Sequence, residues 1–379
     1  MDTPQAIAFA LGQFKRQALL FVALILLVIA GFSLWPRERI GTAGNLPHGT
    51  DIFESARSGD SDKALAQFRQ VMADPSASQE RVIAANFAAF IARIHTPDPI
   101  EPFAAIRDLK NIIADPSVPL RKRAGAINLL ASAYNESGRR KEIAQEIFKD
   151  QPYSTYTERG ASWTGSVQSL LLWGYSVYPT PRTAYDIAVT YVGDALRLSF
   201  PQQSIPQEGR PKIGKAEAIQ NAEIYLKRGD EIRAAQLAAD PSTPEDEAYV
   251  AHHTWRTYVI GMLAYFKGAP YKDQYRKEFE EYFTFMASER DNLDSLKYLP
   301  MMRWVYASLL LQVDSDSAAA KAQLDALMQL MRSNPSLLPD LSATIRMYKG
   351  YSDPSYWTDS SEKLAALSPE FKAFYESIK

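Results

Sequence analysis

The stretch AEAIQNAEIYLKRGDEIRAAQLAADP, residues 216–241, decides the fold class that we predict for this chain. Its apolar residues follow the spacing of two helices that fold back on each other at Arg228-Gly229-Asp230. Residues 124–152 repeat the pattern. Four positions share one spacing in the two stretches, namely Ala222, Tyr225, Gly229 and Ala234 in one and Ala131, Tyr134, Gly138 and Ile143 in the other. The sequence therefore predicts helical hairpins.

The ends of these hairpins recur along the chain. Residues 53–75 place a Gly-Asp turn before a helical stripe of apolar residues, which are Ala64, Leu65, Phe68, Val71 and Met72. An Asp-Pro-Ser stop follows at 74–76 and returns at 115–117 and 240–242, with a weaker form, Asn-Pro-Ser, at 334–336. The first two stops are 41 residues apart, a spacing typical of stacked helical hairpins. One such hairpin cannot bury its apolar face alone, so we expect neighbours to stack.

The shared spacing of these four positions resembles that of the tetratricopeptide repeat, a helical hairpin that stacks into a scaffold. The spacing exceeds the roughly 34 residues of that repeat, so we expect degenerate units or loop insertions. The resemblance implies that the first helix of each hairpin lines a groove, where amide side chains bind an extended peptide. Under the resemblance the groove residues are Asn86, Asn128, Ser132, Asn135 and Glu136, followed by Glu223 and Leu226. Asparagines that simply face solvent are the alternative.

The apolar run ALLFVALILLVIAGFSLW, residues 18–35, contains no charge and approaches the roughly 20 residues that cross a bilayer. We predict a tail at 1–16, a transmembrane helix at 17–35 and a linker at 36–50. Lysine and arginine are equal in number near its two ends, and the short tail favours a signal anchor with the large domain outside the cytoplasm. We expect a single-pass protein of a bacterial cytoplasmic membrane. The reverse topology and cleavage after Ala30 remain alternatives.

The rest of the chain has helical patterns only, and no stretch has the pattern of a strand. We predict one half of the repeat array at 51–199, a loop or linker at 200–214 and the other half at 215–379. Aromatic-rich helices are expected at 163–178 and 182–200. Later helices are expected at 215–239, 244–267, 271–288, 293–313, 317–333, 337–349 and 361–379, the last of which caps the array. The predicted fold class is all-α, a transmembrane helix followed by an α-solenoid.

The composition limits the kinds of binding and catalytic site that the chain can contain. A net charge of −2 gives no bias toward nucleic acid, and the absence of cysteine excludes disulfides and thiolate sites. His252 and His253 are adjacent, so on a helix they point about 100° apart and cannot chelate one metal from one face. The acidic runs at 245–247 and 278–281 are typical of helix surfaces, and the aromatic stripe of 275–286 is typical of packing. We therefore expect no cofactor, no metal and no enzymatic activity.

Two basic clusters stand out. Arg121, Lys122 and Arg123 open a helix whose N-terminal dipole disfavours cations, so another interaction must hold them there. Arg139, Arg140 and Lys141 begin the partner helix of the same hairpin. We predict that the clusters form one basic patch for anionic lipid or an acidic partner, with a plain solvated surface as the alternative.

The sequence thus leads us to expect a membrane-anchored scaffold or assembly factor that binds partner proteins through a helical-repeat surface. A structural subunit of an envelope complex, self-associated through the ends of the stack, is one alternative. The other is a glycan- or solute-binding protein or lytic enzyme with an α-superhelical body. The oligomeric state stays open.

Overall fold

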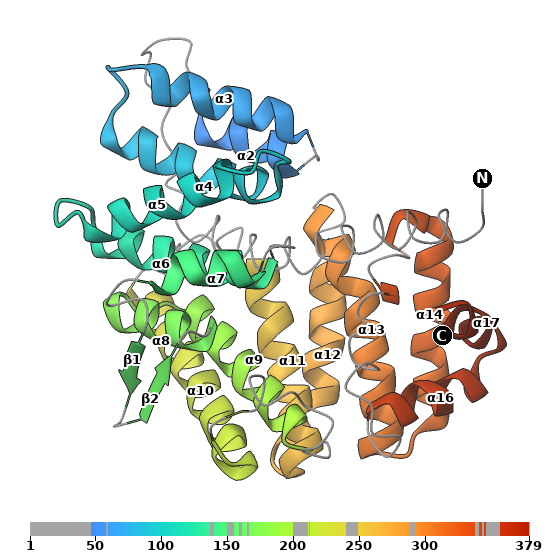
Figure 1. The fold of residues 1–379 in the computed structure, drawn as a ribbon. Helices are drawn as coiled ribbons and strands as arrows, with labels where there is room; N and C mark the ends of the chain where they lie inside the picture. Colours follow the sequence, from blue (N-terminus) through green and yellow to red (C-terminus); the bar gives the residue numbers. More distant parts are fainter. Residues whose placement is uncertain are drawn as a thin grey trace. The chain divides into compact units, whose positions relative to one another are not determined.

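The computed structural model describes residues 47–57, 60–136, 140–149, 155–158, 161–164, 167–199, 211, 213–239, 249–288, 293–337, 341–342, 345 and 357–378. Helices make up this part of the chain, apart from one two-stranded hairpin (Figure 1). The all-α class is therefore confirmed, whereas the expectation of no strand is wrong. The chain divides into two units between Thr183 and Ala184, ahead of the predicted boundary at 200–214.

The N-terminal unit, up to Thr183, is built from helical pairs. Its pairs are α2 (Gly49–Arg57) with α3 (Ser61–Ala73), α4 (Gln79–His95) with α5 (Glu101–Ala114) and α6 (Leu120–Glu136) with α7 (Arg140–Phe148). The first helices α2, α4 and α6 pack in sequence, α5 also packs on α7, and α8 (Val167–Val177) packs on α6. Each pair thus contacts the pairs next to it, which fits an α-solenoid.

The apolar stripe predicted for α3 faces this core. Ala64, Leu65, Phe68 and Val71 are buried together with residues of α2 and α4. Met72, which the pattern assigned to the same stripe, is 43% exposed instead. The helix rotation after Val71 carries this side chain past the edge of the contact.

Identical turns end α3 and α5. Asp74 Oδ1 accepts hydrogen bonds from the backbone N and Oγ of Ser76, both at 2.7 Å, and Asp115 Oδ1 accepts from Ser117 N at 2.8 Å and Oγ at 2.6 Å. The helices that follow begin at Gln79 and Leu120, 41 residues apart, so the sequence period is a structural period here. The N-cap of α4 is Ser78, whose Oγ accepts a hydrogen bond from Arg81 N. The stop at 240–242 lies outside the described residues.

The long helices account for the length of this period. The α4 and α6 helices have 17 residues each and α5 has 14, so this unit departs from a 34-residue repeat in helix length without a loop insertion.

A β-hairpin interrupts the helices where the sequence predicted one to begin at Trp163. The antiparallel strands β1 (Thr155–Glu158) and β2 (Ala161–Thr164) place Tyr156 opposite Trp163, and α8 starts only at Val167. Threonine, tyrosine and tryptophan favour strands, and that local preference prevails over the apolar helical spacing that continues into α8. Packing of the strands on α8 supports a hairpin that is marginal by itself.

The C-terminal unit, from Ala184, includes most of α9 (Pro181–Arg197), α10 (Lys215–Ala239) and three further pairs. These are α11 (Tyr249–Lys267) with α12 (Tyr271–Ser288), α13 (Leu293–Val313) with α14 (Ser317–Ser333) and α16 (Trp357–Leu367) with α17 (Pro369–Ile378). A short 3-10 helix, η4 (Pro335–Leu337), follows α14. Figure 1 shows α11 to α14 side by side, and α13 packs on both α11 and α16. The bounds predicted for α12, α13 and α14 agree with the structure.

The predicted aromatic stripe of α12 packs in the core of this unit. Tyr275, Phe279, Tyr282 and Met286 are buried. The ring of Phe279 stacks on Tyr306 of α13, with the centroids 4.6 Å apart. Phe283 is half-buried, and the Arg303 guanidinium lies 4.4 Å from its ring centroid. The interpretation of this stripe as packing is confirmed.

The hairpin predicted at Arg228-Gly229-Asp230 is wrong, because α10 is one continuous helix of 25 residues. Gly229 is buried inside it, and a Cβ atom placed there would lie 2.4 Å from Tyr185 Cε1 of α9. This glycine permits close helix packing instead of a turn. At the other stretch, α6 ends at Glu136 and α7 begins at Arg140, as predicted for a helical pair.

Two helices close the C-terminal end where one was predicted. Ser368 separates α16 from α17, and its Oγ accepts a hydrogen bond from Phe371 N while Pro369 opens the new helix. Five apolar residues of this segment were expected to cap the stack. Leu364, Phe371 and Tyr375 are buried, whereas Leu367 and Phe374 are half-buried. The other face of α17 exposes Glu370, Lys372 and Glu376. The stack therefore ends in a polar surface at α17.

The predicted transmembrane helix at 17–35 and the tail before it lie outside the described residues. Within the described ranges, none of the helices combines the length and the apolar character that crossing a bilayer requires.

We predict that Gly229→Ala destabilises the protein by about 1–3 kcal/mol, because the new methyl group overlaps the Tyr185 ring. The midpoint of chemical denaturation, followed by circular dichroism, measures this effect. The matched control is Gly193→Ala in α9, where an added Cβ meets no atom within 4 Å and helix propensity favours alanine by up to about 1 kcal/mol. Equal effects of the two substitutions would contradict the packing role of Gly229.

Candidate functional site

Two of the residues predicted to line a groove on the first helices are buried inside the protein. Asn86 and Ser132 are buried, and α4 and α6 are each covered by neighbours from the preceding and following pairs. Asn86 Nδ2 donates to Val82 O at 2.9 Å, and Ser132 Oγ donates to Asn128 O at 3.3 Å. These residues are therefore corrected from groove to core. Asn135 and Glu136 lie in α6, but their side chains are outside the described part.

Asn128 holds the start of α9. Its Nδ2 donates to Thr183 Oγ1 at 2.9 Å, and Thr180 Oγ1 accepts from Thr183 N at 3.1 Å as the cap of that helix. A Cβ on Gly174 of α8 would lie 2.6 Å from Asn128 Oδ1, so the glycine leaves room for the amide. Asn128 thus connects α6 to the first turn of α9 and packs against α8 at Gly174.

The partner of Asn86 is a buried arginine that the sequence analysis missed. Arg93 is 3% exposed, and its guanidinium donates to Asn86 Oδ1 at 2.8 Å, to Asp108 Oδ2 at 2.7 Å and to Glu101. The guanidinium also lies 4.3 Å from the Phe68 ring centroid. This cluster connects α3, α4 and α5. A carboxylate seven or more residues after an arginine gives no distinctive signal in sequence, which explains the omission.

The basic patch predicted from residues 121–123 and 139–141 falls partly outside the described part of the chain. Arg121, Lys122 and Arg123 begin α6, whereas Arg140 begins α7 just beyond the end of α6. The length of α6 separates them by about 20 Å. Arg139 and the side chains of Arg140 and Lys141 lie outside the described part.

The interaction that holds a cation at the start of α6 is a helix cap. Arg123 Nε donates to Ile113 O, at the carbonyl end of α5, at 2.7 Å. A cation is favourable there because the α5 dipole is negative at that end. Arg121 is exposed, and Lys122 is half-buried.

On α10, charged pairs form the contact with α11. Glu223 accepts from Lys267 Nζ at 2.5 Å and from Tyr271 Oη at 2.9 Å, while Leu226, its companion in the predicted groove, is buried. Burial acts to raise the pKa of Glu223, but the hydrogen bonds from Lys267, Tyr271 and Lys227 outweigh it and lower the pKa. The predicted groove residue is thus part of an interhelical ion pair.

A second charged network lies two turns further along α10. Asp230 Oδ1 accepts from Tyr185 Oη at 2.7 Å and from Arg256 Nε at 2.8 Å, and Arg256 Nη1 donates to Glu278 Oε2 at 2.5 Å. It links α9, α10, α11 and α12. Burial, followed by the charge and hydrogen bond of Asp230, raises the pKa of Tyr185 well above its ordinary value. The phenol therefore stays protonated, and the partly exposed network connects the four helices.

Two histidines flank this network, and both contact aromatic rings. His252 lies edge-on to Tyr185 with the centroids 6.1 Å apart, and His253 stacks on Phe285 at 4.6 Å. Burial, with smaller contributions from Arg256 and Arg233, lowers the pKa of His253 to about 4. His253 is therefore neutral at physiological pH.

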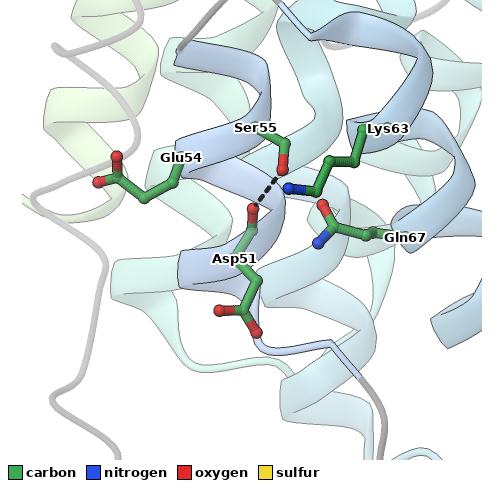
Figure 2. Close-up of a pocket in the computed structure, with 5 residues that line it drawn as sticks. All are labelled: Asp51, Glu54, Ser55, Lys63 and Gln67. Atoms are coloured by element: carbon green, nitrogen blue, oxygen red, sulfur yellow. Dashed lines mark hydrogen bonds between the residues drawn. The ribbon is translucent and has the colours of Figure 1, made fainter.

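A surface hollow of about 400 Å³ lies between α2 and α3 (Figure 2). It is lined by Asp51, Glu54, Ser55, Lys63 and Gln67. Figure 2 shows Glu54 pointing away from Lys63, while Ser55 Oγ donates to Asp51 O at 2.9 Å. Its charged groups do not converge on one point, so we assign no ligand to this hollow.

Metal ligands do not gather in the described ranges, where no three histidine or acidic side chains lie close enough to share an ion. The acidic run at 245–247 is outside those ranges, and Glu278 of the other run binds Arg256. No family model, curated protein or solved structure matches the chain.

We predict that Arg93→Met destabilises the protein by about 3–5 kcal/mol, because two carboxylates would lose their buried counter-ion. The lower end applies because Asp108 is 32% exposed. Denaturation midpoints measure the effect. Arg107→Met, at an exposed position of α5, serves as the control and should change stability by no more than about 0.5 kcal/mol.

Adding Glu101→Gln and Asp108→Asn to Arg93→Met should recover part of the lost stability, since the uncompensated charges are gone. A triple variant as unstable as Arg93→Met would contradict the charge explanation.

We also predict a loss of stability in acid that depends on His253. Its pKa falls from 6.5 to about 4 on folding, so the native state binds fewer protons. Its contribution is complete above about pH 6.5 and is lost as the pH falls toward 4, up to about 3 kcal/mol. His253→Phe should flatten the plot of unfolding free energy against pH in this window.

Proposed function

We propose that this protein is a membrane-anchored scaffold that binds partner proteins through the surface of its helical pairs. The observation that carries the proposal is the packing of each pair against its neighbours in both units. Such packing leaves the outer faces of every pair free for contacts. The likeness to tetratricopeptide repeats is part of the proposal, and the 41-residue register of α4 and α6 supports it.

The membrane part of the proposal rests on the sequence. Residues 18–35 carry no charge and are flanked by Lys15, Arg16 and the Arg37–Arg39 segment. An anchor confines the scaffold to the membrane and raises its effective concentration for partners there, so weak surface contacts suffice. The proposed location is a bacterial cytoplasmic membrane with the helical units outside the cytoplasm.

The binding surface differs from the one that the repeat resemblance implied. Asn86, Ser132 and Leu226 are buried, so partners must contact outer faces and edges of the pairs. The charged network around Arg256 is a candidate contact site for a polar partner, because the Asp230 side chain is 40% exposed. The polar face of α17 weighs against the alternative of a structural subunit that grows through its C-terminal end.

Alkaline extraction and proximity labelling test the two parts of this proposal. The full chain should remain in the membrane fraction at high pH, and a chain that begins at residue 40 should be released. Labelling from the C-terminus should recover a reproducible set of protein neighbours.

The control carries residues 1–46 of this chain on an unrelated globular domain. If it labels the same neighbours, the helical units do not select partners and the scaffold proposal is wrong.

A further inference from the structure

The start of the described chain and four helix ends, those of α3, α4, α5 and α6, meet at one edge of the N-terminal unit. Arg81 Nη2 donates to Pro47 O at 3.4 Å, which fixes the chain entry beside the start of α4. Gln79 Nε2, in the same first turn, donates to Asp115 Oδ2 at 2.9 Å and to Ser117 Oγ at 3.0 Å. We call residues 47–48, 74–81 and 115–122 the turn edge.

The turn edge exposes an apolar side chain beside two cations. Leu120, the first residue of α6, is 53% exposed, and the exposed Arg121 and half-buried Lys122 follow it. An exposed apolar side chain of this kind fits the headgroup region of an anionic bilayer, where the neighbouring cations meet lipid phosphates.

Acidic groups at the same edge weaken the electrostatic attraction between this edge and anionic lipid. Asp74 and Asp115 accept hydrogen bonds from the serines of their own turns, and those bonds lower the pKa of both carboxyl groups. Both are therefore ionised near neutral pH, and Glu80 is exposed nearby. Contact with lipid must then centre on Leu120 and its two cations.

From these observations we propose that the turn edge lies against the membrane surface, with Leu120 in the headgroup region and Arg121 and Lys122 beside lipid phosphates. The inference rests on the proposed anchor. Residues 36–46, between the anchor and Pro47, span at most about 40 Å when extended, so the edge that carries Pro47 is held near the bilayer.

The opposite end of α5 supplies a matched reference. Ile100 is 66% exposed and precedes Glu101, without an adjacent cation. It lies about 20 Å from the turn edge, the length of α5. If the turn edge contacts lipid, Leu120 is immersed and Ile100 stays in water.

Site-directed spin labels test this difference, because the chain has no cysteine of its own. The full chain with Leu120→Cys or Ile100→Cys is labelled and inserted into vesicles of phosphatidylcholine and phosphatidylglycerol. We expect the label at 120 to be several-fold less accessible to a water-soluble nickel chelate than the label at 100, and more accessible to oxygen. Equal accessibility at the two sites would overturn the proposal.

Vesicle flotation of both labelled chains checks the anchor separately. Chains that fail to float would refute the anchor, whereas floating chains with equal label accessibility would refute only the contact of the turn edge. Protection at 120 that appears only after other membrane proteins are added would identify a protein contact and would also overturn the proposal.

A charge variant tests the role of the cations. Arg121→Gln with Lys122→Gln should expose the label at 120 to the nickel chelate, as should vesicles of phosphatidylcholine alone. Lys321→Gln with Lys372→Gln removes the same charge from exposed sites in the C-terminal unit and should have no effect. Unchanged protection in the first variant would contradict the assignment of phosphate contacts.

Discussion

The fold depends on the apolar contact between one helical pair and the next. In the N-terminal unit, α2 and α3 bury Ile52, Leu65 and Phe68 only because α4 supplies Ala85, Ala88 and Ala92 on the other side. Two helices of 9 and 13 residues are too short to hold each other in water. Each pair is therefore stable only when neighbouring pairs pack against it, and the apolar core extends along the series of pairs.

Buried polar groups give this series of pairs its register. The Arg93 guanidinium reaches two carboxylates on α5 and an amide on α4, and Asn128 ties α6 to the cap of α9. Hydrogen-bonding groups of this kind are costly when unpaired, so they disfavour displaced helices more strongly than apolar contacts do. The same residues that looked like ligand contacts in the sequence therefore position the helices.

Helix ends were the feature best predicted from the sequence. Contacts between side chains of different helices were the feature predicted least well. Prolines and the Asp-Pro-Ser motifs act locally, so the bounds of α12, α13 and α14 and the turn at Asp74 followed from short stretches. Gly229 shows the opposite case, because only the Tyr185 ring of another helix decides that this glycine continues a helix instead of ending it. In the other stretch with the same spacing, one helix ends at Glu136 and the next begins at Arg140. The same local spacing thus continues a helix in one stretch and ends a helix in the other, because contacts with residues far away in the sequence differ.

The candidate site was predicted less well for the same reason. The groove assignment of Asn86, Ser132 and Leu226 assumed an open inner face, and the burial of these side chains follows from neighbours that periodicity does not reveal. Arg123 was identified as a cation in need of a partner, and that partner proved to be the carbonyl of Ile113. The network of Tyr185, Asp230 and Arg256 brings together three helices, and no spacing in the chain points to it.

The charged contact between α10 and α11 differs in kind from the contact between α10 and α9. Glu223 with Lys267 and Asp230 with Arg256 meet across the first, whereas stacked Tyr191 and Tyr225 and the close approach at Gly229 form the second. Salt screens the former and leaves the latter almost untouched. A rise in ionic strength therefore acts unevenly on this helix, because it weakens the ion pairs of α10 with α11 more than the ring contacts of α10 with α9.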